Sequence, residues 1–467
     1  MATYYVDPDW TGTKSGTQSE PWSVLNWATI NSSLASEDVT VYFSAREAGS
    51  DTDEDYGAGI DIEGNKTADP GYTLTLDGYS YYNTNDSTPS WAAYSGSSMC
   101  IIEDVLAQNS SHTKYNDVTV RGFNIVKPTS GKAVAIAGDN WTIEDCDISH
   151  GGSVSDGPLV YVVPTADSGH EGSSAYTPAC DNINILNNNI HDSYGELIYV
   201  GGGGSGYPDS GDGYPSHTNI TITGNTIDGS GALGGQPDGI DIKGGIVGIT
   251  ISGNEILNIN TAGCRPIVMQ GVHAEGNQSA VIEKNYIHDC TNSDEGISLS
   301  NSWGDSEGVE IRNNIIDTIN GEGIVVYSGS ATSITILNNT IYNCGDEGIR
   351  VDSGNTVTVQ NNALLDNNSG GAQNTANGTM TQSNNAHNGS WAGSATDNVS
   401  GLTAGAFVDA SGGDFSLSSG SALIDVGYTL SSFADDYAGI DRPQGDSWDI
   451  GAYEYEIKAV GQMAVMF

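Results

Sequence analysis

The stretch Asp238-Gly239-Ile240-Asp241-Ile242-Lys243-Gly244 decides the fold, because the chain repeats its pattern several times. The copies, in chain order, begin at Glu196, Arg265, Glu295, Glu322 and Glu347. Each copy alternates apolar and variable residues, which is the period of a half-buried strand. The leading positions 196, 238, 265, 295, 322 and 347 are 42, 27, 30, 27 and 25 residues apart. Self-similarity at such a period predicts a stacked repeat array.

A second feature recurs between these strands, an asparagine followed two residues later by Ile or Leu. It occurs at Asn188, Asn225, Asn254, Asn285, Asn314, Asn339 and Asn362. Asparagine tolerates left-handed backbone in a tight turn, and stacked copies can hydrogen-bond from coil to coil. Coils of this length with three short strands predict an all-β fold, the right-handed parallel β-helix.

The ends of such a stack must be covered, because an open end exposes both apolar core and strand edges. We therefore expect an N-terminal cap over residues 1–59, the parallel β-helix over 60–400 and a C-terminal cap segment over 401–467. In this β-helix Ile240, Ile297, Ile324 and Ile349 are predicted to stack in one inward column.

The charge of the chain limits its partners. Fourteen Lys and Arg stand against 59 Asp and Glu, a formal net charge of -45. Such a surface repels nucleic acid and anionic membranes and attracts cations. No apolar run approaches the roughly 18 residues of a membrane span. We therefore expect neither nucleic acid nor a membrane as a partner.

The start of the chain and its cysteines bear on location. No basic region followed by an apolar core opens the chain, so we expect no signal peptide and an extracellular or virion-associated protein. The six cysteines lie far apart without CxxC spacing, which predicts buried free thiols and no zinc site.

The two ends of the chain resemble a known group of proteins. Residues 3–12 with Pro21-Trp22, and the closing stretch Trp448-Asp449-Ile450-Gly451-Ala452-Tyr453-Glu454-Tyr455, are similar to the entry and closing segments of bacterial and phage pectate-lyase-like β-helix proteins. With the coils, the resemblance covers most of the chain. It implies the architecture, and the superfamily includes lyases, hydrolases, tailspikes and non-enzymes.

Candidate site residues follow from the outward positions of the repeated strands. Neighbouring coils are about 4.8 Å apart. One polar cluster is therefore expected from Asp238, Asp241, Lys243, Arg265, Gln270 and Glu295. Sugar-binding residues are expected at Glu196, Tyr199 and Tyr327, and at Tyr207 and Tyr214 in the long insertion after residue 201, since aromatic rings stack on sugars.

This cluster suits β-elimination from a uronic-acid polymer, which needs a base and cations that stabilise an enolate. Lys243 is the candidate base beside Arg265, His273 is the fallback base, and Glu295 completes the catalytic set. Asp238, Asp241 and Glu295 are the expected ligands of Ca²⁺, the expected cofactor. The acidic stretch followed by Lys243 is similar to the calcium cluster and lysine base of one pectate lyase family, where the lysine comes from a later coil.

Other functions stay open. Asp238 and Glu295, two coils apart, could instead serve an inverting glycosidase. The protein could also be a tailspike-like or surface fibre that binds glycans or only builds structure, a monomer or, as a viral fibre, a homotrimer. His191 and His288 share one repeat position (Ile-His-Asp) and are interpreted as turn residues. The leading prediction is a polysaccharide lyase whose partner is a polysaccharide.

Overall fold

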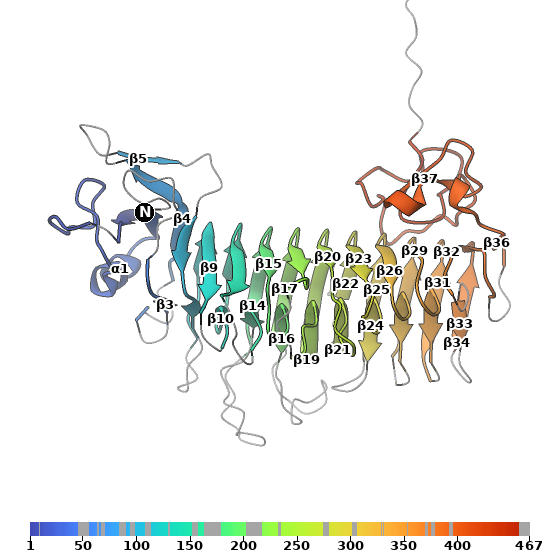
Figure 1. The fold of residues 1–467 in the computed structure, drawn as a ribbon, viewed down its shortest axis with the longest axis horizontal. Coiled ribbons are helices and arrows are strands. Elements are labelled where there is room, and N and C mark those ends of the chain that lie inside the picture. The colour runs from blue at the N-terminus through green and yellow to red at the C-terminus, as the bar shows by residue number, and fades with distance from the viewer. Residues whose placement is uncertain are drawn as a thin grey trace, which may run out of the picture.

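A computed structural model describes most of the chain. The described residues are 1–8, 10–44, 56–62, 65–66, 71–83, 90–93, 99–107, 114–128, 131–151, 157–162, 179–201, 217–231, 235–273, 280–300, 306–327, Gly329, 331–352, 354–368, 372–374, 379–391 and 396–456. The chain winds into a long stack of coils, seen from the side in Figure 1. Almost every strand pairs in parallel with the equivalent strand of the next coil.

Each coil contributes one strand to each of three faces. Face 1, which contains the repeated motif, consists of β3 (Ile60–Asp61), β7 (Val105–Leu106), β10 (Val134–Ile136), β13 (Val160–Val162), β16 (Ile198–Gly201), β19 (Ile240–Ser252), β21 (Ile267–His273), β24 (Ile297–Ser300), β27 (Ile324–Val326), β30 (Ile349–Val351) and β33 (Ala372–Asn374). Strand β19 continues around the corner into face 2, with a register shift between Lys243 and Ile246.

Faces 2 and 3 complete the coils. Face 2 consists of β1 (Ala2–Val6), β2 (Val39–Ser44), β4 (Leu74–Asn83), β8 (Val118–Arg121), β11 (Trp141–Glu144), β14 (Asp181–Leu186), β17 (His217–Thr223), β19, β22 (Ala280–Glu283), β25 (Val309–Arg312), β28 (Ile334–Leu337), β31 (Thr356–Gln360) and β34 (Thr379–Ser383). Face 3 consists of β6 (Cys100–Ile102), β9 (Phe123–Lys127), β12 (Asp147–His150), β15 (Asn189–His191), β18 (Thr226–Asp228), β20 (Glu255–Leu257), β23 (Tyr286–Cys290), β26 (Ile315–Ile319), β29 (Thr340–Tyr342), β32 (Ala363–Leu365), β35 (Ala386–His387) and β36 (Val399–Ser400).

The remaining elements lie at the two ends. Near the N-terminus are the helix α1 (Trp27–Leu34) and β5 (Ser90–Ala93), which pairs antiparallel with β4. Towards the C-terminus are the turns η1 (Ala404–Ala406) and η2 (Ala410–Gly412) and the antiparallel pair β37 (Phe407–Asp409) and β38 (Asp414–Leu417). The division at residues 59 and 400 stays a prediction.

The predicted inward isoleucine column is confirmed. Ile240, Ile297, Ile324 and Ile349 lie in one register row of face 1, together with Ile198 and Ile267. None of these side chains is exposed. Burying each one contributes about 1.5–3 kcal/mol, so the column is a main source of stability.

The glycine of the repeated motif is required by close backbone approach. A Cβ at Gly239 would lie 2.4 Å from the carbonyl oxygen of Pro266, and one at Gly296 would lie 2.7 Å from that of Gly323. Those carbonyls belong to the next coil and accept the backbone N–H groups of Ile240 and Ile297, which directly follow the two glycines. Any side chain at these positions would separate the coils, which explains why the motif contains glycine.

The asparagine turns form a continuous buried ladder, as the sequence predicts. The Oδ1 of Asn285 accepts hydrogen bonds from the backbone N–H and the Nδ2 of Asn254, at 3.0 and 2.9 Å. Its own Nδ2 donates to the Oδ1 of Asn314 and to the carbonyl of Ile251, both at 2.9 Å. The ladder continues past Asn362 to Asn385.

One detail of the turn prediction is wrong. The left-handed residue is the one before each ladder asparagine, for example Lys284 (φ 54°), Asn313 (φ 51°) and Asn338 (φ 52°). The ladder asparagine itself is held by its neighbours in the stack. The side chain of the left-handed residue points away from the ladder, where it can contact residues outside the coils.

The C-terminal segment uses those outward side chains to dock on the stack. Asn313, Asn338 and Asn361 donate from Nδ2 to the carbonyls of Asp435, Asp449 and Tyr428, at 2.9, 3.0 and 2.8 Å. Figure 1 shows this segment, around β37, lying against the later coils. It covers apolar side chains of face 3 such as Ile315, Ala363 and Leu365.

Two further expectations concern cysteines and membranes. All six cysteines are free and buried, as predicted. Within the described ranges, none of the helices has the length and apolar character needed to cross a membrane.

Removing one amide from the ladder should destabilise the fold. Asn285→Ala would leave buried donors and acceptors of Asn254, Asn314 and Ile251 without partners, so we expect a loss of about 2–4 kcal/mol in urea unfolding. The exposed Asn189, whose side-chain amide donates to Asp147, is the control, and Asn189→Ala should stay within about 0.5 kcal/mol. Equal effects at the two positions would contradict the role of the ladder.

Candidate active site

The outward side chains of face 1 form the candidate site, which we call the outer ladder. It is defined by Glu196, Tyr199, Asp238, Asp241, Lys243, Arg265, Gln270, Glu295, Glu322, Tyr327 and Arg350. Tyr199, Asp241 and Val268 lie in one register row, and Lys243 lies opposite Gln270. Each coil places its strand of face 1 beside the equivalent strand of the preceding coil. Residues about 27 apart in the sequence therefore become neighbours at about 4.8 Å.

Lys243 and Asp241 form an ion pair that lies mostly out of solvent. The Nζ of Lys243 is 2.8 Å from the Oδ2 of Asp241, and their side chains are 15% and 1% exposed. The same Nζ lies 4.9 Å from the centre of the Tyr199 ring. Burial raises the pKa of the Asp241 carboxyl, against the opposing effect of the Lys243 charge. Among the described residues no donor meets hydrogen-bond geometry at either oxygen of this carboxylate, so Lys243 contacts it as an ion pair.

Arg265 and Glu295 form a second pair, one coil further on. The Nε of Arg265 donates to the Glu295 carboxylate, and the hydroxyl of Tyr327 donates to the same group from the following coil. Burial, together with this hydrogen bond, raises the pKa of Tyr327 to about 12. The Arg265 side chain is 22% exposed and that of Glu295 only 4%, so the cation lies nearer to the solvent.

Asp238 lies beneath this surface. It is 1% exposed, and its Oδ1 accepts the backbone N–H of Arg265 at 2.7 Å while its Oδ2 accepts from Gln236 at 3.2 Å. Burial, and then the negative charge of Asp241, raises the pKa of Asp238 to about 7. Its observed role is to hold the start of the next coil.

The expected calcium ligands do not converge as one set. Within the described ranges, no group of three or more His, Cys, Asp or Glu side chains is placed to hold a metal ion. Asp241 is paired with Lys243, and Glu295 with Arg265 and Tyr327. Calcium binding by Asp238, Asp241 and Glu295 stays a prediction.

Stacked cations and tyrosines extend the ladder at both ends. Arg350 bonds the Glu322 carboxylate and lies 5.1 Å over the Tyr327 ring. At the other end Lys132 lies 4.8 Å over Tyr161, whose ring is 5.2 Å from that of Tyr199. Tyr161 was not predicted from the sequence because its strand lacks the repeated motif, and the structure places it in register with Tyr199.

Some predicted residues are placed only in part. Tyr207 and Tyr214 lie outside the described residues, and for His273 the structure describes only the backbone, at the end of β21. Glu196 is largely buried, and burial raises the pKa of its carboxyl. Gln270 has a buried Oε1 without a hydrogen-bond donor among the described residues.

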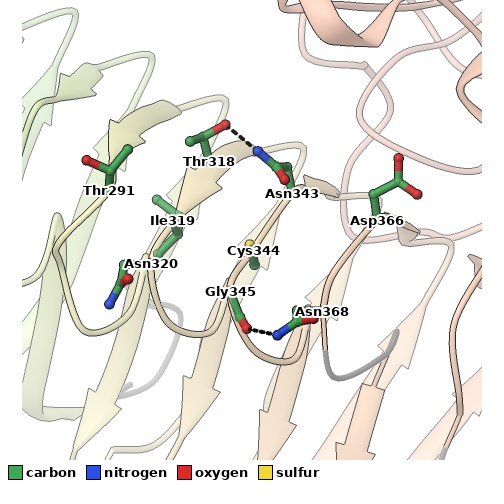
Figure 2. Close-up of a pocket in the computed structure, with 9 residues that line it drawn as sticks. All are labelled: Thr291, Thr318, Ile319, Asn320, Asn343, Cys344, Gly345, Asp366 and Asn368. Atoms are coloured by element: carbon green, nitrogen blue, oxygen red, sulfur yellow. Dashed lines mark hydrogen bonds between the residues drawn. The ribbon is translucent and has the colours of Figure 1, made fainter.

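A separate pocket of about 420 Å³ lies where face 3 turns into face 1, and we call it the corner pocket (Figure 2). Its lining comes from successive coils and consists of Thr291, Thr318, Ile319, Asn320, Asn343, Cys344, Gly345, Asp366 and Asn368. It contains none of the residues predicted for catalysis. Its polar side chains are amides, hydroxyls and one carboxylate, so its chemistry differs from that of the outer ladder.

Residues 173–364 match the model of a family described as "Right handed beta helix region". The fold is a right-handed parallel β-helix, so the predicted fold class is confirmed, and the match agrees with the resemblance to β-helix repeat proteins. No curated protein matches the chain.

Several solved structures are similar over most of the chain. The pectate lyase Pel9A is 13% identical, with 98% of this chain and 97% of that chain covered and a TM-score of 0.41. An alginate lyase from Paenibacillus sp. str. FPU-7 is 15% identical, with 76% and 95% covered and a TM-score of 0.35. PfbA, a surface adhesin of Streptococcus pneumoniae, is 13% identical, with 77% and 82% covered and a TM-score of 0.36. Similarity at this level does not indicate a shared substrate.

The two histidines of the Ile-His-Asp repeat lie on face 3, away from the outer ladder. His191 bonds Asp147 through Nε2 at 3.0 Å and Asp192 through Nδ1 at 2.7 Å. His288 is held in the same way by Glu255 and Asp289. The hydrogen bond to Asp147, more than that to Asp192, raises the pKa of His191 to about 9 against the effect of burial.

This arrangement predicts a pH-dependent contribution to stability. The folded pKa of His191 exceeds the unfolded value of about 6.5, so its stabilisation is complete below about pH 6.5 and is lost as the pH rises through about 9. His191→Gln should therefore lower the melting temperature more at pH 6 than at pH 10. His387→Gln is the control, because His387 bonds a backbone carbonyl instead of a carboxylate. A pH-independent effect at His191 would contradict the assignment.

Proposed function

We propose that the protein binds a uronic-acid polysaccharide along the outer ladder and cleaves it by β-elimination. The observation that carries this proposal is the placement of cations. The whole chain has only 14 Lys and Arg at a net charge of -45. Four of them, Lys132, Lys243, Arg265 and Arg350, lie on the outward positions of face 1. A polymer of acidic sugars would meet positive charge here on a protein that otherwise repels it.

Arg265 is suited to hold the carboxylate of the sugar that reacts. Its guanidinium is planar and always charged, it is more exposed than Glu295, and it can share its donors between two carboxylates. Elimination places negative charge on the sugar carboxylate as the neighbouring proton leaves. A fixed cation at that point stabilises the enolate more than the ground state, which is the condition for catalysis.

Lys243 is the proposed base. An ammonium group cannot accept a proton, so Lys243 must first pass its own proton to a neighbour, and Asp241 is 2.8 Å away in a site that disfavours charge. The neutral amine then takes the proton beside the sugar carboxylate. The electron pair forms the new C=C bond as the C–O bond to the leaving sugar breaks, and water protonates the leaving oxygen.

A second candidate function is glycoside hydrolysis. The raised pKa of Asp238, about 7, would leave about half of this carboxyl protonated at pH 7, so that it could serve as a general acid. Its two oxygens are already bonded to Arg265 and Gln236, and it lies below the surface. Elimination is therefore the better-supported proposal. In either case the polymer lies outside cells, so we propose an extracellular or virion-associated protein.

The test is turnover on a panel of uronic polysaccharides, followed by the ultraviolet absorbance of the unsaturated product. Lys243→Ala should lower turnover by roughly 10²–10⁴ if Lys243 is the base. Arg265→Ala should also lower turnover, because the enolate loses its cation. Lys14→Ala is the matched control, since Lys14 is an exposed lysine near the N-terminus that bonds the hydroxyl of Ser23, and this variant should turn over normally.

Folding is checked by the melting temperature of each variant. Lys243→Ala leaves the buried Asp241 carboxylate without its ion-pair partner, which can unfold the protein. In that case the double variant Asp241→Asn/Lys243→Met, which removes both charges, is compared with the parent protein instead. Full activity in a folded Lys243 variant would refute its role as the base. New reducing ends without unsaturated product would favour the hydrolase, and no cleavage of any polymer would favour a binding or structural fibre.

A further inference from the structure

The corner pocket has a distinct pattern of free acceptors. Its amides donate to the protein: Asn320 to the carbonyl of Ser293 at 3.2 Å, Asn343 to the hydroxyl of Thr318 at 3.0 Å and Asn368 to the carbonyl of Gly345 at 3.0 Å. No described residue donates to the Oδ1 of any of these three. The amide oxygens are therefore fixed in place with lone pairs available to a ligand.

One backbone position in this pocket violates a local preference. Thr318 has φ 58°, a left-handed conformation that is a genuine outlier for a β-branched residue. The equivalent positions in neighbouring coils are Asn258, Asp289, Asn343 and Asp366, residue types that tolerate this conformation well. The threonine hydroxyl donates to Asp317 at 2.8 Å and accepts from Asn343, so it fixes the amide that faces the pocket. Such strain indicates a functional position.

The chemistry of the pocket excludes two classes of ligand. It has no Lys or Arg in its lining, and an anion would meet Asp366 on a strongly acidic protein. A metal ion would meet a single carboxylate, and its Oδ1 already accepts from Asn388 at 2.5 Å. Fixed amide oxygens and hydroxyls on successive coils instead match a ligand with many hydroxyl donors.

We propose that the corner pocket binds an uncharged, hydroxyl-rich saccharide. This binding goes beyond the proposed elimination and does not depend on it, because the pocket shares no lining residue with the outer ladder. Asn320 and Asn368 occupy one repeat position two coils apart, and Asn343 lies on the coil between them at a neighbouring position. An oligosaccharide lying along the axis can therefore bond one amide on each of three successive coils. The asparagine oxygens accept its hydroxyl protons, and the Thr318–Asn343 bond holds the central acceptor in place (Figure 2).

The experiment is titration calorimetry of the full chain with maltohexaose, cellohexaose, xylohexaose and mannohexaose. We expect saturable binding of at least one of them. Thr318→Asn relieves the strained backbone, so it should keep or raise the melting temperature and yet weaken binding by about tenfold, the size of one hydrogen bond. Asn343→Gly, which keeps the left-handed backbone but removes the amide, should weaken binding similarly.

Controls separate this site from the outer ladder. Asn292→Ala removes an exposed amide one coil away that does not line the pocket, and it should bind normally. Hexagalacturonate binding should be lost in Arg265→Ala and kept in Thr318→Asn. This expectation concerns binding alone, so it holds whether or not the protein catalyses elimination. The proposal is overturned if no uncharged probe binds, if both pocket variants bind as well as Asn292→Ala, or if a glucosamine hexamer binds in place of the uncharged sugars.

Discussion

The whole structure depends on the hydrogen bonding of each coil to the next. Backbone ladders on three faces and one column of buried asparagines join the coils at a fixed spacing. A buried amide that loses its partners is costly, and the asparagines satisfy one another only when every coil keeps its register. The ladder asparagines such as Asn285 therefore fix which residues stack. Every property of the outer surfaces follows from that register.

A stack of this kind must also be closed. The C-terminal segment is held by asparagines in left-handed turns, Asn313, Asn338 and Asn361, one position before the ladder asparagines. One turn thus serves two purposes: the ladder residue joins the coils, and the preceding residue presents an amide to a second layer. Covering Ile315 and Leu365 keeps apolar surface from water and adds to the stability of the later coils.

The same register concentrates charge on face 1. Carboxylates at equivalent positions of adjacent coils would repel one another at about 4.8 Å, so their burial requires cations. Arg265 pairs with Glu295 and Arg350 with Glu322 across one coil, while Lys243 pairs with Asp241 along its own strand. In each pair the cation is more exposed than the carboxylate. A chain that is acidic overall therefore presents cations along one face.

Most of the fold could be predicted from the sequence because it is repetitive. The alternation around Ile240, the recurrence of Asn285 and its equivalents, and the glycine of the motif each express a local rule that every coil obeys. Those rules place the outward columns, so the neighbours of Asp241 and Arg265 were also predictable. The corner pocket was not, because the contact of Thr318 with Asn343 of the next coil depends on side-chain placement and not on the repeat pattern.

The partners of each side chain were decided only by the tertiary structure. The sequence spacing predicts that Asp238, Asp241 and Glu295 lie near one another. It cannot show that Asp238 accepts a hydrogen bond from the backbone N–H of Arg265, or that the Tyr327 hydroxyl donates to Glu295. Nor can it show how deeply each carboxylate is buried, which sets its pKa. By itself, the sequence determined the β-helix, its inward column and its outward rows. The tertiary structure decided which charges pair and which acceptors stay free, because those depend on side-chain direction and burial.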